Sequence, residues 1–560
     1  MAKPGNHKKL TVLIVGGYGN FGARLVGMLS EAPELRLIIA GRSPARAQAM
    51  CAGSGAAERR PAAFDLQGDI DAQLAALKPD IVVDTAGPFQ AYGADPYRLA
   101  RAAVGRGVAY LDIADGRAFV CGIGALNELA IANDTFALSG CSSVPALSDA
   151  VLRRLADGMT KTDRVEGGIT PSGRLAMGLS VIQAIASYAG KRVTLRVGGQ
   201  AVRRYCLTDG RRHVLAVPGV VPLVPRRFGL IDVPDLDLMP KRCAGLQTVM
   251  FGAGLRPGIA HHAVRLAAWA VRLRLLPSLL PFARIMRRTA RWMVGGEPRG
   301  GMFVRLSGRD EAGPVTREWV LIAEGDDGPN IPLMACVALI RRIAAGRPPE
   351  AGARPCLDEL DLDEFVPLFA RFQISTGIWQ ERATEQPLYR ALLGSAYELL
   401  PAPVAEMHDI AGEKTVSGRA NVERGTGWLA RLLARFARLP SASDDIEVTV
   451  TFRRKGDREV WERRYGPELM SSASEAGRGA WRHLVVERFG LIAFGFALTA
   501  DERGLEMHLR RWSIAGVRLP LWLAPRLTAV ETQKDGVFQF DVSASSRLAG
   551  PIVRYRGWLA

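Results

Sequence analysis

The chain has 560 residues, of which 48% are hydrophobic and 23% are charged, and its formal net charge is +17. A chain of this length is too long for a single hydrophobic core, so we expect about two to four domains. The composition is ordinary for a soluble globular protein, which excludes a fibrous or low-complexity chain.

The cysteines and the N-terminus indicate the cellular compartment of the protein. The seven cysteines are scattered, without a C-x-x-C pair or a His/Cys cluster, so a reducing compartment is expected and no metal site is predicted. The N-terminus is polar, and no apolar run reaches the roughly 18 residues of a spanning helix. We therefore predict a cytoplasmic protein.

A glycine-rich turn follows the first predicted strand, residues 10–15. The turn has the spacing G-x-G-x-x-G and opens an amphipathic helix. In this arrangement Gly17 permits the tight turn, Gly19 lets the backbone approach a pyrophosphate, and Gly22 lets the helix pack against the strand. The unpaired N–H groups at the start of the helix then bind the phosphates. The residues predicted to contact a dinucleotide here are Gly17, Tyr18, Gly19, Asn20, Phe21 and Gly22.

The second predicted strand, residues 35–40, ends at Gly41, Arg42 and Ser43. An NAD-binding protein usually has Asp or Glu at this point to bind the ribose 2′-hydroxyl. A guanidinium can instead bind a 2′-phosphate through two hydrogen bonds. The sequence therefore predicts NADP rather than NAD, with Arg42 and Ser43 at the 2′-phosphate.

Residues 1–150 continue to alternate between strand-like and helix-like segments. Six strands with helical crossovers predict a doubly wound parallel sheet of order 3-2-1-4-5-6, with the ligand across the carboxyl ends of the strands. The remaining predicted strands are 62–64, 81–85, 109–113 and 136–139, with helices at 95–106 and 118–132.

Two further groups of cofactor contacts follow from this sheet. Asp65 ends the third strand, where its carboxylate can accept from the adenine amino group or simply cap a helix. The fourth strand lies beside the glycine turn, and it is followed by Ala86, Gly87, Pro88 and Phe89. Gly87 would let the backbone approach the cofactor, and Phe89 would wall the nicotinamide ribose, although a simple strand-to-helix turn explains the same residues.

Three side chains at or just beyond strand carboxyl ends are candidates for catalysis. Hydride transfer to a carbonyl or imine needs a proton donor within hydrogen-bond reach. Tyr92 or Asp112 could supply that proton, and Ser143 could hold the polarised oxygen. The alternative is structural: Asp112 as part of a buried strand and Ser143 as a helix cap.

Residues 151–350 predict a second, α+β domain for substrate binding or dimerisation. Strands are expected at 165–170, 193–197, 302–307 and 315–323, with helices near 181–189 and 335–345. The glycine- and proline-rich stretch 346–355 is predicted to be a linker or domain edge.

Residues 263–296 form the densest basic stretch, with seven arginines and no acidic residue among apolar side chains. Pro277 and Pro281 divide the stretch into two predicted helices. Basic amphipathic helices with Trp are typical of peripheral membrane contact, but helices that pack on the protein share the pattern. No nucleic-acid-binding module is recognisable, so nucleic acid is not expected as a partner.

Residues 388–560 predict a β-rich accessory domain. A helical lead, residues 388–400, precedes short strands at regular spacing, which favours an antiparallel sheet that is strongly curved or closed. The predicted strands include 446–453, 459–465, 483–489, 505–512 and 537–543. His408 is interpreted as structural.

The N-terminal motifs together resemble the NADP-binding, Rossmann-type domain of the saccharopine-dehydrogenase-like oxidoreductases. The resemblance covers residues 9–150 well and reaches about residue 350 more weakly, through 328–332. The last 170 or so residues resemble the domain of unknown function DUF4166. The matching stretches are 16–22, 40–42, 84–93, 110–114 and 140–145 for the first family, and 389–394, His408, 461–465 and 553–557 for the second.

The resemblance implies an NADP(H)-dependent oxidoreductase, and the second domain suggests an apolar or lipid-like substrate rather than saccharopine. Saccharopine is a polyanion, whereas this chain places apolar Arg/Trp helices in that domain. A non-catalytic NADP(H)-binding protein with a lipid- or partner-binding C-terminal domain is the first alternative, and a saccharopine reductase is the second. The sequence leaves the oligomeric state open, a homodimer included.

Overall fold

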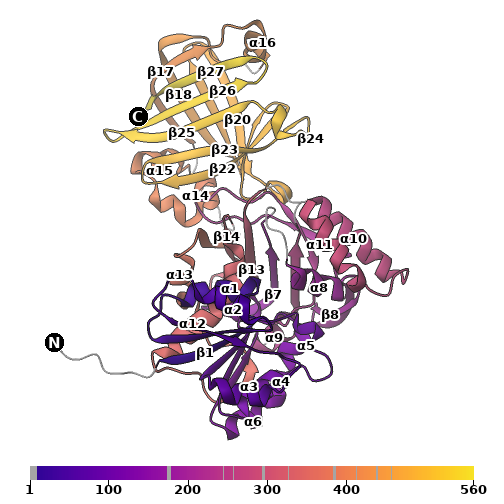
Figure 1. Cartoon of the computed structure of the whole chain (residues 1–560). Coiled ribbons are helices and arrows are strands. Elements are labelled where there is room, and N and C mark those ends of the chain that lie inside the picture. Colours follow the sequence, from indigo (N-terminus) through magenta and orange to yellow (C-terminus); the bar gives the residue numbers. More distant parts are fainter. Residues whose placement is uncertain are drawn as a thin grey trace, which may run out of the picture. The chain divides into compact units, whose positions relative to one another are not determined.

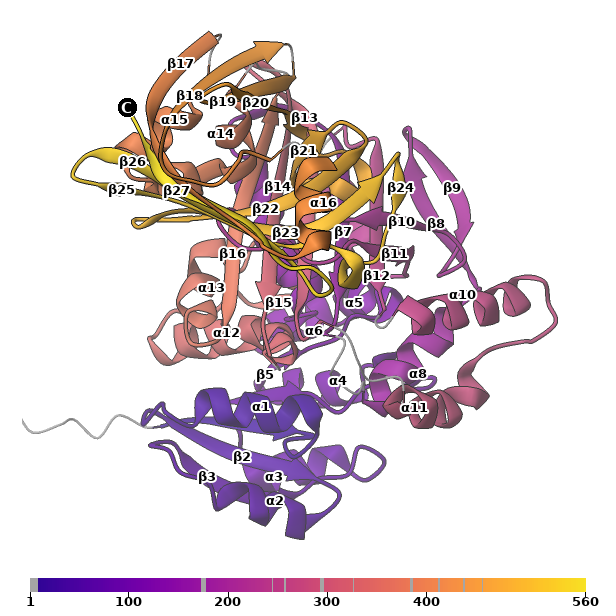
Figure 2. The ribbon, with the colours of Figure 1, turned by 90° about the horizontal axis from the view of Figure 1, so that it is seen from above.

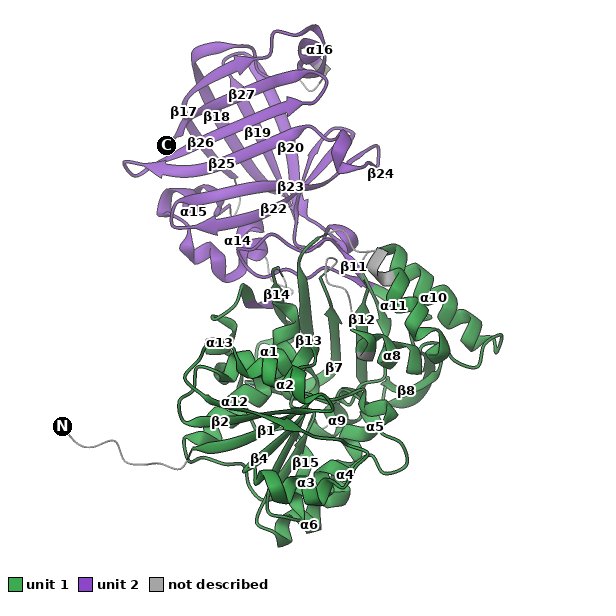
Figure 3. Ribbon diagram, in the orientation of Figure 1, with its two compact units in different colours: residues 1–211, 227–375 green, residues 212–226, 376–560 purple. Residues whose placement is uncertain are grey.

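The computed structural model describes residues 9–172, 178–243, 245–255, 258–292, 297–325, 327–382, 386–410, 413–436, 439–455 and 457–560. The chain forms two compact units, drawn in two colours in Figure 3. Unit 1 consists of residues 1–211 and 227–375, and unit 2 of residues 212–226 and 376–560. Unit 2 therefore takes a short segment from the middle of the chain as well as its C-terminal part.

The first sheet of unit 1 has seven strands in the order β15-β6-β5-β4-β1-β2-β3. All neighbouring strands in this sheet pair in parallel. The predicted Rossmann-type order 3-2-1-4-5-6 is confirmed, and one further strand extends it. The strands are β1 (Leu10–Val15), β2 (Leu35–Gly41), β3 (Glu58–Ala63), β4 (Ile81–Asp84), β5 (Ala109–Asp112), β6 (Phe136–Ser139) and β15 (Gly352–Pro355).

The continuous apolar run of β1 has a direct cause, because both faces of this sheet are covered by helices. Val12 and Ile14 belong to one hydrophobic cluster, and Leu13 and Val15 belong to another on the opposite face. The first cluster takes side chains from α1 (Asn20–Leu29), α2 (Pro44–Cys51), α5 (Arg117–Gly122), α7 (Ser148–Ala156), α9 (Asp235–Arg242), α12 (Met334–Ala344) and α13 (Leu362–Phe369). The second takes them from α3 (Ile70–Leu77), α4 (Arg98–Val104) and α6 (Asn127–Ala132).

The added strand β15 lies where the sequence predicted a linker, at 346–355, and that prediction is wrong for its last four residues. Gly352 to Pro355 pair with β6 at the edge of the sheet. Proline has no backbone N–H to donate, so within a sheet it is tolerated at an edge strand, where no ladder hydrogen bond is lost. Its presence here made the segment look like a linker in the sequence. The chain thus returns to the first sheet after passing through the second.

The second sheet has nine strands, seven of them in the order β10-β11-β12-β7-β13-β14-β16, with β8 beside β12 and β9 beside β8. It is mixed, because β12 pairs parallel with β7 while β13 pairs antiparallel with both β7 and β14. This confirms the α+β character predicted for the second part of the chain. The strands are β7 (Met159–Thr170), β8 (Arg192–Val197), β9 (Gln200–Tyr205), β10 (Gly210–His213), β11 (Arg226–Leu230), β12 (Thr248–Gly254), β13 (Gly300–Asp310), β14 (Gly313–Ala323) and β16 (Ile374–Arg382).

The basic stretch forms two helices, α10 (Gly258–Arg272) and α11 (Ala283–Trp292), while residues 293–296 lie outside the described residues. Figure 2 shows both near α8 (Leu179–Tyr188). The Arg272 guanidinium lies 4.5 Å from the ring centre of Tyr205 and 4.2 Å from that of Trp269. Within the described chain, no helix combines the length and apolarity that crossing a membrane requires.

Unit 2 is an antiparallel β-barrel, which confirms the predicted β-rich C-terminal domain (Figure 1). Its eleven strands follow the order β22-β21-β20-β19-β18-β17-β27-β26-β25-β23-β24, and β22 also pairs with β23. That last pairing closes the ring and leaves β24 outside it. The strands are β17 (Glu413–Arg424), β18 (Ser443–Lys455), β19 (Arg458–Tyr465), β20 (Glu468–Ala476), β21 (Val485–Phe489), β22 (Ile492–Asp501), β23 (Gly504–Ile514), β24 (Val517–Arg518), β25 (Arg526–Lys534), β26 (Val537–Ser546) and β27 (Gly550–Leu559).

Three α-helices, the 212–226 segment and most of β16 also belong to the described part of unit 2. The helices are α14 (Leu388–Leu393), α15 (Ala402–His408) and α16 (Trp428–Phe436). α15 packs on β25 and β26, and α16 packs on β27. The indole N–H of Trp379 donates to the carbonyl of Ala216 at 2.6 Å, which ties the inserted segment to the C-terminal part.

Candidate NADP-binding site

The turn after β1 is tight because of Gly16, which has φ = +81°. The sequence assigned this role to Gly17, and that assignment is wrong. A Cβ on Gly17 would lie 2.9 Å from Ile39 Cγ2 and 3.0 Å from the carbonyl oxygen of Ile14. Gly17 is therefore required for close packing of the turn against the first two strands, and Gly16 supplies the left-handed backbone.

Gly22 has the role that the motif predicts. A Cβ on Gly22 would lie 2.2 Å from the carbonyl oxygen of Gly16, so α1 can approach the turn only with glycine at this position. Gly19 precedes α1 with an extended backbone, and its N–H donates to Gly16 O at 2.7 Å. The start of α1 is therefore held against the turn, as a phosphate cradle requires.

A cavity of about 510 Å³ lies over the glycine turn and the carboxyl ends of the parallel strands. Most of the predicted cofactor residues line it, and Gly17, Gly22 and Ser43 lie behind the lining. The predicted residues in its wall are Tyr18, Gly19, Asn20, Phe21, Arg42, Asp65, Ala86, Gly87, Pro88, Phe89 and Tyr92.

The end of the cavity near β2 is basic. Arg42 and Arg46 both line it, and Arg46 lies 4.6 Å from the ring centre of Tyr18. The Tyr18 hydroxyl accepts from the backbone N–H of Ser43 at 2.7 Å, and the Ser43 side chain caps α2. Sequence reasoning missed Arg46, although its position four residues after Arg42 at the start of α2 was available as a signal. Two guanidiniums at this end suit a 2′-phosphate.

Asp65 lies in the cavity wall with Leu66 and Gln67. Its carboxylate accepts from the backbone N–H of Gln67 at 3.1 Å, so it shapes its own loop. The helix-cap alternative for Asp65 is wrong, because Asp69 caps α3, and the adenine contact stays a prediction.

The loop after β4 supplies an apolar wall. Phe89 is buried and packs against Tyr92 and Phe119, with ring centres 5.2 and 5.1 Å apart. Gly87, with φ = +20°, and Pro88 shape this loop at the carboxyl end of β4, and both line the cavity. The loop fixes Tyr92 at the inner end of the cavity.

Tyr92 is the predicted catalytic residue that lines the cavity. Its hydroxyl donates to the carboxylate of Asp84, at 2.9 Å from Oδ2 and 3.1 Å from Oδ1. Asp84 is fully buried, and burial raises its pKa to about 6. Burial, with Asp84 next in importance, raises the pKa of the Tyr92 phenol, so Tyr92 keeps its proton. The sequence did not single out Asp84, whose position at the end of β4 was the available signal.

Asp112 and Ser143 lie behind the cavity wall rather than in it. Asp112 is fully buried, and its Oδ1 accepts from Gly140 N–H at 2.8 Å, Ala114 N–H at 2.9 Å and the Ser139 hydroxyl at 3.1 Å. Burial raises the pKa of Asp112 to about 7. These bonds make Asp112 a clamp between β5 and β6. Its catalytic role and that of Ser143 stay predictions, and neither side chain reaches the cavity.

The residues that sequence reasoning missed at the inner end are Gln90, Asp115 and Ser142. Gln90 donates to Asp115 at 3.1 Å. The second part of unit 1 adds apolar groups, since Val181 and Ala184 of α8 also line the cavity. The inner end is therefore bounded by a few polar groups on one side and aliphatic groups on the other.

Comparison with known families agrees with this geometry. Residues 12–154 match the family model described as the saccharopine dehydrogenase NADP binding domain. Residues 400–559 match the model described as a domain of unknown function, DUF4166. Both resemblances predicted from the sequence are confirmed. No curated protein matches the chain.

Similar solved structures include dehydrogenases and a reductase. GenD2 from gentamicin A biosynthesis in complex with NAD has 14% identity and a TM-score of 0.33, covering 65% of this chain and 93% of that chain. An engineered D-amino acid dehydrogenase bound to NADP+ has 14% identity and a TM-score of 0.32, covering 64% and 99%. Biliverdin reductase from Synechocystis sp. PCC 6803, in complex with biliverdin and NADP+, has 14% identity and a TM-score of 0.27, covering 63% and 94%. Residues 12–154 are thus similar to the saccharopine dehydrogenase NADP binding domain, which supports NADP as the cofactor, and residues 400–559 are similar to DUF4166.

Proposed function

We propose that unit 1 is an NADP(H)-dependent oxidoreductase that acts on the carbonyl or alcohol group of an apolar molecule. The observation that carries the proposal is the position of Tyr92, which lines the same cavity as the glycine turn and is bonded to a buried carboxylate. NADP(H), when bound, supplies or accepts a hydride. Arg42, Arg46 and the start of α1 would hold its phosphates.

Tyr92 and Asp84 together control a proton at the inner end of the cavity. While Asp84 is ionised, the Tyr92 O–H is donated to it and is not available to a substrate. When Asp84 is protonated, it can donate to the phenol oxygen, which frees the Tyr92 O–H for a substrate oxygen. Because burial raises the pKa of Asp84 to about 6, this exchange falls within an accessible pH range. Tyr92 is thus the proposed proton donor and Asp84 its positioning residue.

The walls of the inner end support an apolar substrate. Val181, Ala184, Phe89 and Ile113 line it. Removing such side chains and a hydrocarbon substrate from water stabilises the complex by about 25 cal/mol per Å² of apolar surface. A polyanion such as saccharopine would need several cationic groups at this end, and the arginines in the described wall lie instead at the opposite, ribose end.

The test is NADPH consumption with a panel of long-chain aldehydes and ketones, with saccharopine and NADP+ assayed in parallel. We expect consumption with the apolar carbonyls and none with saccharopine. Tyr92→Phe should lower kcat without changing NADPH affinity, and Asp84→Asn should remove the rise in rate as the pH falls through about 6. NADPH binding without consumption by any compound would favour the non-catalytic alternative.

We also propose that α10 and α11 contact the surface of an anionic membrane. Ile259, Leu266, Leu275 and Ile285 are each more than half exposed, and the helices carry no acidic residue. Exposed apolar side chains interleaved with arginines suit the interface of an anionic bilayer.

The membrane proposal predicts flotation with anionic liposomes at low salt. Replacing Arg287 and Arg288 by Gln should weaken binding, since each basic residue near such a surface contributes about 1 kcal/mol. The control is the double variant Arg464→Gln/Arg503→Gln, which removes the same charge from exposed positions of unit 2. Equal flotation of both double variants, or no flotation of the native chain, contradicts the proposal.

A further inference from the structure

The lumen of the barrel in unit 2 carries polar side chains at positions that alternate with exposed ones. On β19, Trp461 and Tyr465 belong to the barrel core, and Arg463 lies between them in the same phase, while Arg464 is exposed. Because successive side chains of a strand point to opposite faces, Arg463 points into the lumen. The lumen is therefore not lined by hydrocarbon alone.

Arg463 is fully engaged inside the barrel. Its guanidinium lies 3.1 Å from the carboxylate of Glu487, donates to the Ser472 hydroxyl at 2.9 Å, and lies 4.8 Å from the ring centre of Trp461. Ser472 in turn donates to Glu487 at 2.7 Å. The charges of Arg463 and Glu487 thus cancel one another.

One end of the lumen is filled by α14 and α15. The imidazole of His408 in α15 stacks on Tyr389 in α14, with ring centres 3.7 Å apart, and its Nε2 bonds to Glu531 on β25. Burial and then three nearby carboxylates raise the pKa of Tyr389, which shows how acidic this region is. Those carboxylates are Glu531, Glu487 and Glu459.

The rest of the lumen retains open space. Ala529, Val542, Ala544 and Tyr555 share the inward phase of β25, β26 and β27, since Ala529 pairs with Val542 and Val542 pairs with Tyr555. All four remain partly exposed although they face inward. The side chains of Arg463 and Glu487 likewise keep 13% and 14% exposure. Residual exposure at inward positions means that protein atoms do not fill this part of the barrel.

Two phenol groups converge on that space. The rings of Tyr465 and Tyr555 meet edge to face with centres 6.0 Å apart, and Tyr465 is only 2% exposed. Neither hydroxyl has a hydrogen-bond partner among the residues that the structure describes. An oxygen acceptor brought by a ligand would give these hydroxyls a hydrogen-bond partner.

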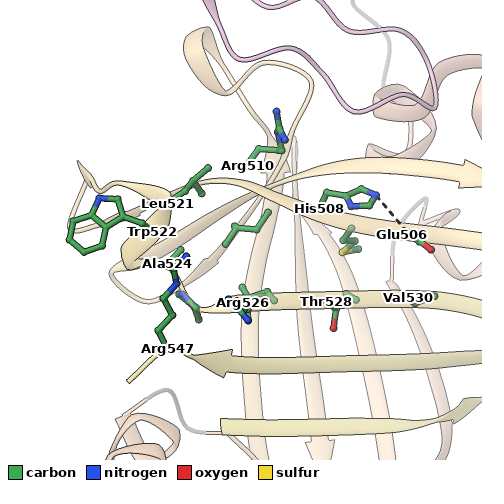
Figure 4. A pocket seen from close by; sticks show the side chains of 15 residues that line it. Glu506, His508, Arg510, Leu521, Trp522, Ala524, Arg526, Thr528, Val530 and Arg547 are labelled. Carbon is green, nitrogen blue, oxygen red and sulfur yellow. Dashed lines mark ion pairs between the residues drawn. The ribbon is translucent and has the colours of Figure 1, made fainter. Parts of the chain in front are cut away.

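The wall of the barrel is interrupted where β23 and β25 separate. Their pairing ends at His508 and Thr528, although β23 continues to Ile514. A cavity of about 550 Å³ lies at this separation, and its lining includes inward-facing Leu527 and Ala529 as well as outward-facing Arg526. Figure 4 shows Trp522 at the mouth of this cavity, where its side chain is 65% exposed. This cavity is where we expect an apolar molecule to enter the lumen.

We propose that the lumen of the unit 2 barrel binds an uncharged, mainly apolar molecule whose carbonyl or hydroxyl oxygen is held by Tyr465 and Tyr555. The wall of Met507, Ala529, Val542 and Ala544 contacts its hydrocarbon part. An anionic head is disfavoured because Arg463 is already neutralised by Glu487. The site is separate from the NADP cavity and does not depend on the redox function proposed for unit 1.

The experiment is displacement of the neutral fluorescent dye Nile red from the full chain by three compounds of similar length: decanol, methyl octyl ketone and decanoate. At neutral pH we expect the alcohol and the ketone to displace the dye at concentrations about tenfold or more below that of decanoate, because the carboxylate must be buried beside Glu487. Absence of saturable dye binding, or preferred binding of decanoate, overturns the proposal.

Variants locate the binding. Tyr465→Phe/Tyr555→Phe leaves the Arg463–Glu487 pair intact and should weaken the ketone by about fivefold to twentyfold, from two lost hydrogen bonds. Arg464→Gln on the outer face is the matched control and should change nothing. Ala544→Trp fills the lumen and should abolish displacement, whereas Ser543→Trp on the outer face should not. If the lumen variants and the outer-face variants behave alike, the dye binds elsewhere and the proposal fails.

Discussion

The two units place polar groups by different geometrical rules. In unit 1 the polar side chains lie at the ends of parallel strands, as Arg42 follows β2 and Asp84 ends β4. In unit 2 they lie in the middle of antiparallel strands, as Arg463 does on β19 and Glu531 on β25. A site at strand ends can therefore be recognised from local sequence motifs. A site in a barrel lumen can be recognised only from the alternation of side chains around a closed sheet.

The largest expected effect tests the inside of the barrel against its outside. Arg463→Met leaves Glu487 buried without its partner and should lower the free energy of unfolding by about 3–5 kcal/mol. Arg419→Met removes an exposed pair with Asp445 and should give no measurable change. Urea unfolding of both variants makes the comparison. A small effect of Arg463→Met would mean that solvent screens the lumen as it does the outer face.

A pH experiment tests the buried clamp of unit 1. Burial raises the pKa of Asp112 from 3.8 to about 7, so the folded state binds this proton more tightly than the unfolded state. Its stabilisation is complete below about pH 4 and is lost as the pH rises through 7, a change of about 4 kcal/mol for about three units. Asp112→Asn should match the native chain at pH 4 and exceed its stability at pH 8, measured by urea unfolding. Parallel pH curves for the two chains would contradict the raised pKa.

The glycine turn gives a prediction with a control on the same helix. Gly22→Ala places a Cβ 2.2 Å from Gly16 O, so α1 must shift; a loss of about 1–3 kcal/mol and much weaker NADPH binding are expected. Gly27→Ala, also in α1, meets nothing within 4 Å and should stabilise the helix by about 0.5–1 kcal/mol. Thermal unfolding and NADPH fluorescence titration measure both. If Gly22→Ala and Gly27→Ala had the same effect on stability and on NADPH binding, the steric explanation would be wrong.

The smallest effect concerns cofactor choice. Arg42→Asp should weaken NADPH by about 10–100-fold, because it removes one charge-assisted contact and adds repulsion, and it should spare NADH. Arg46→Ala should do the same more weakly. Arg60→Ala, an exposed residue on β3, is the control. Equal losses for NADPH and NADH would place the 2′-phosphate elsewhere in the cavity.

The parts that could be predicted from the sequence are those set by short-range rules. The strand, glycine turn and helix at residues 10–29 are consecutive, so their geometry follows from the motif, as does the basic residue after β2. Gly16 and Gly17 exchanged roles because adjacent glycines satisfy the same pattern, and only the backbone angle separates them. Arg46 could also have been predicted, because it follows Arg42 by one helical turn.

The remainder depends on contacts between distant segments. His408 meets Glu531 across 123 residues of chain. Asp84 and Tyr92 are only 8 residues apart, but their contact depends on the fold of the loop after β4. The lumen had one local signal, because Arg463 falls in the buried phase between Trp461 and Tyr465. That signal gains meaning only once the pairing of β22 with β23 shows that the sheet is closed.

The segment 212–226 has a consequence for how the protein can be divided. The backbone passes from one unit to the other three times, after residues 211, 226 and 375. The units are therefore not consecutive domains joined by a single linker. A fragment cut at residue 376 would lack Ala216, whose carbonyl binds the Trp379 indole. The DUF4166 match at 400–559 is accordingly narrower than the body it belongs to. Producing unit 2 by itself calls for a gene that joins residues 212–226 to residues 376–560 through a new linker, rather than for a simple truncation.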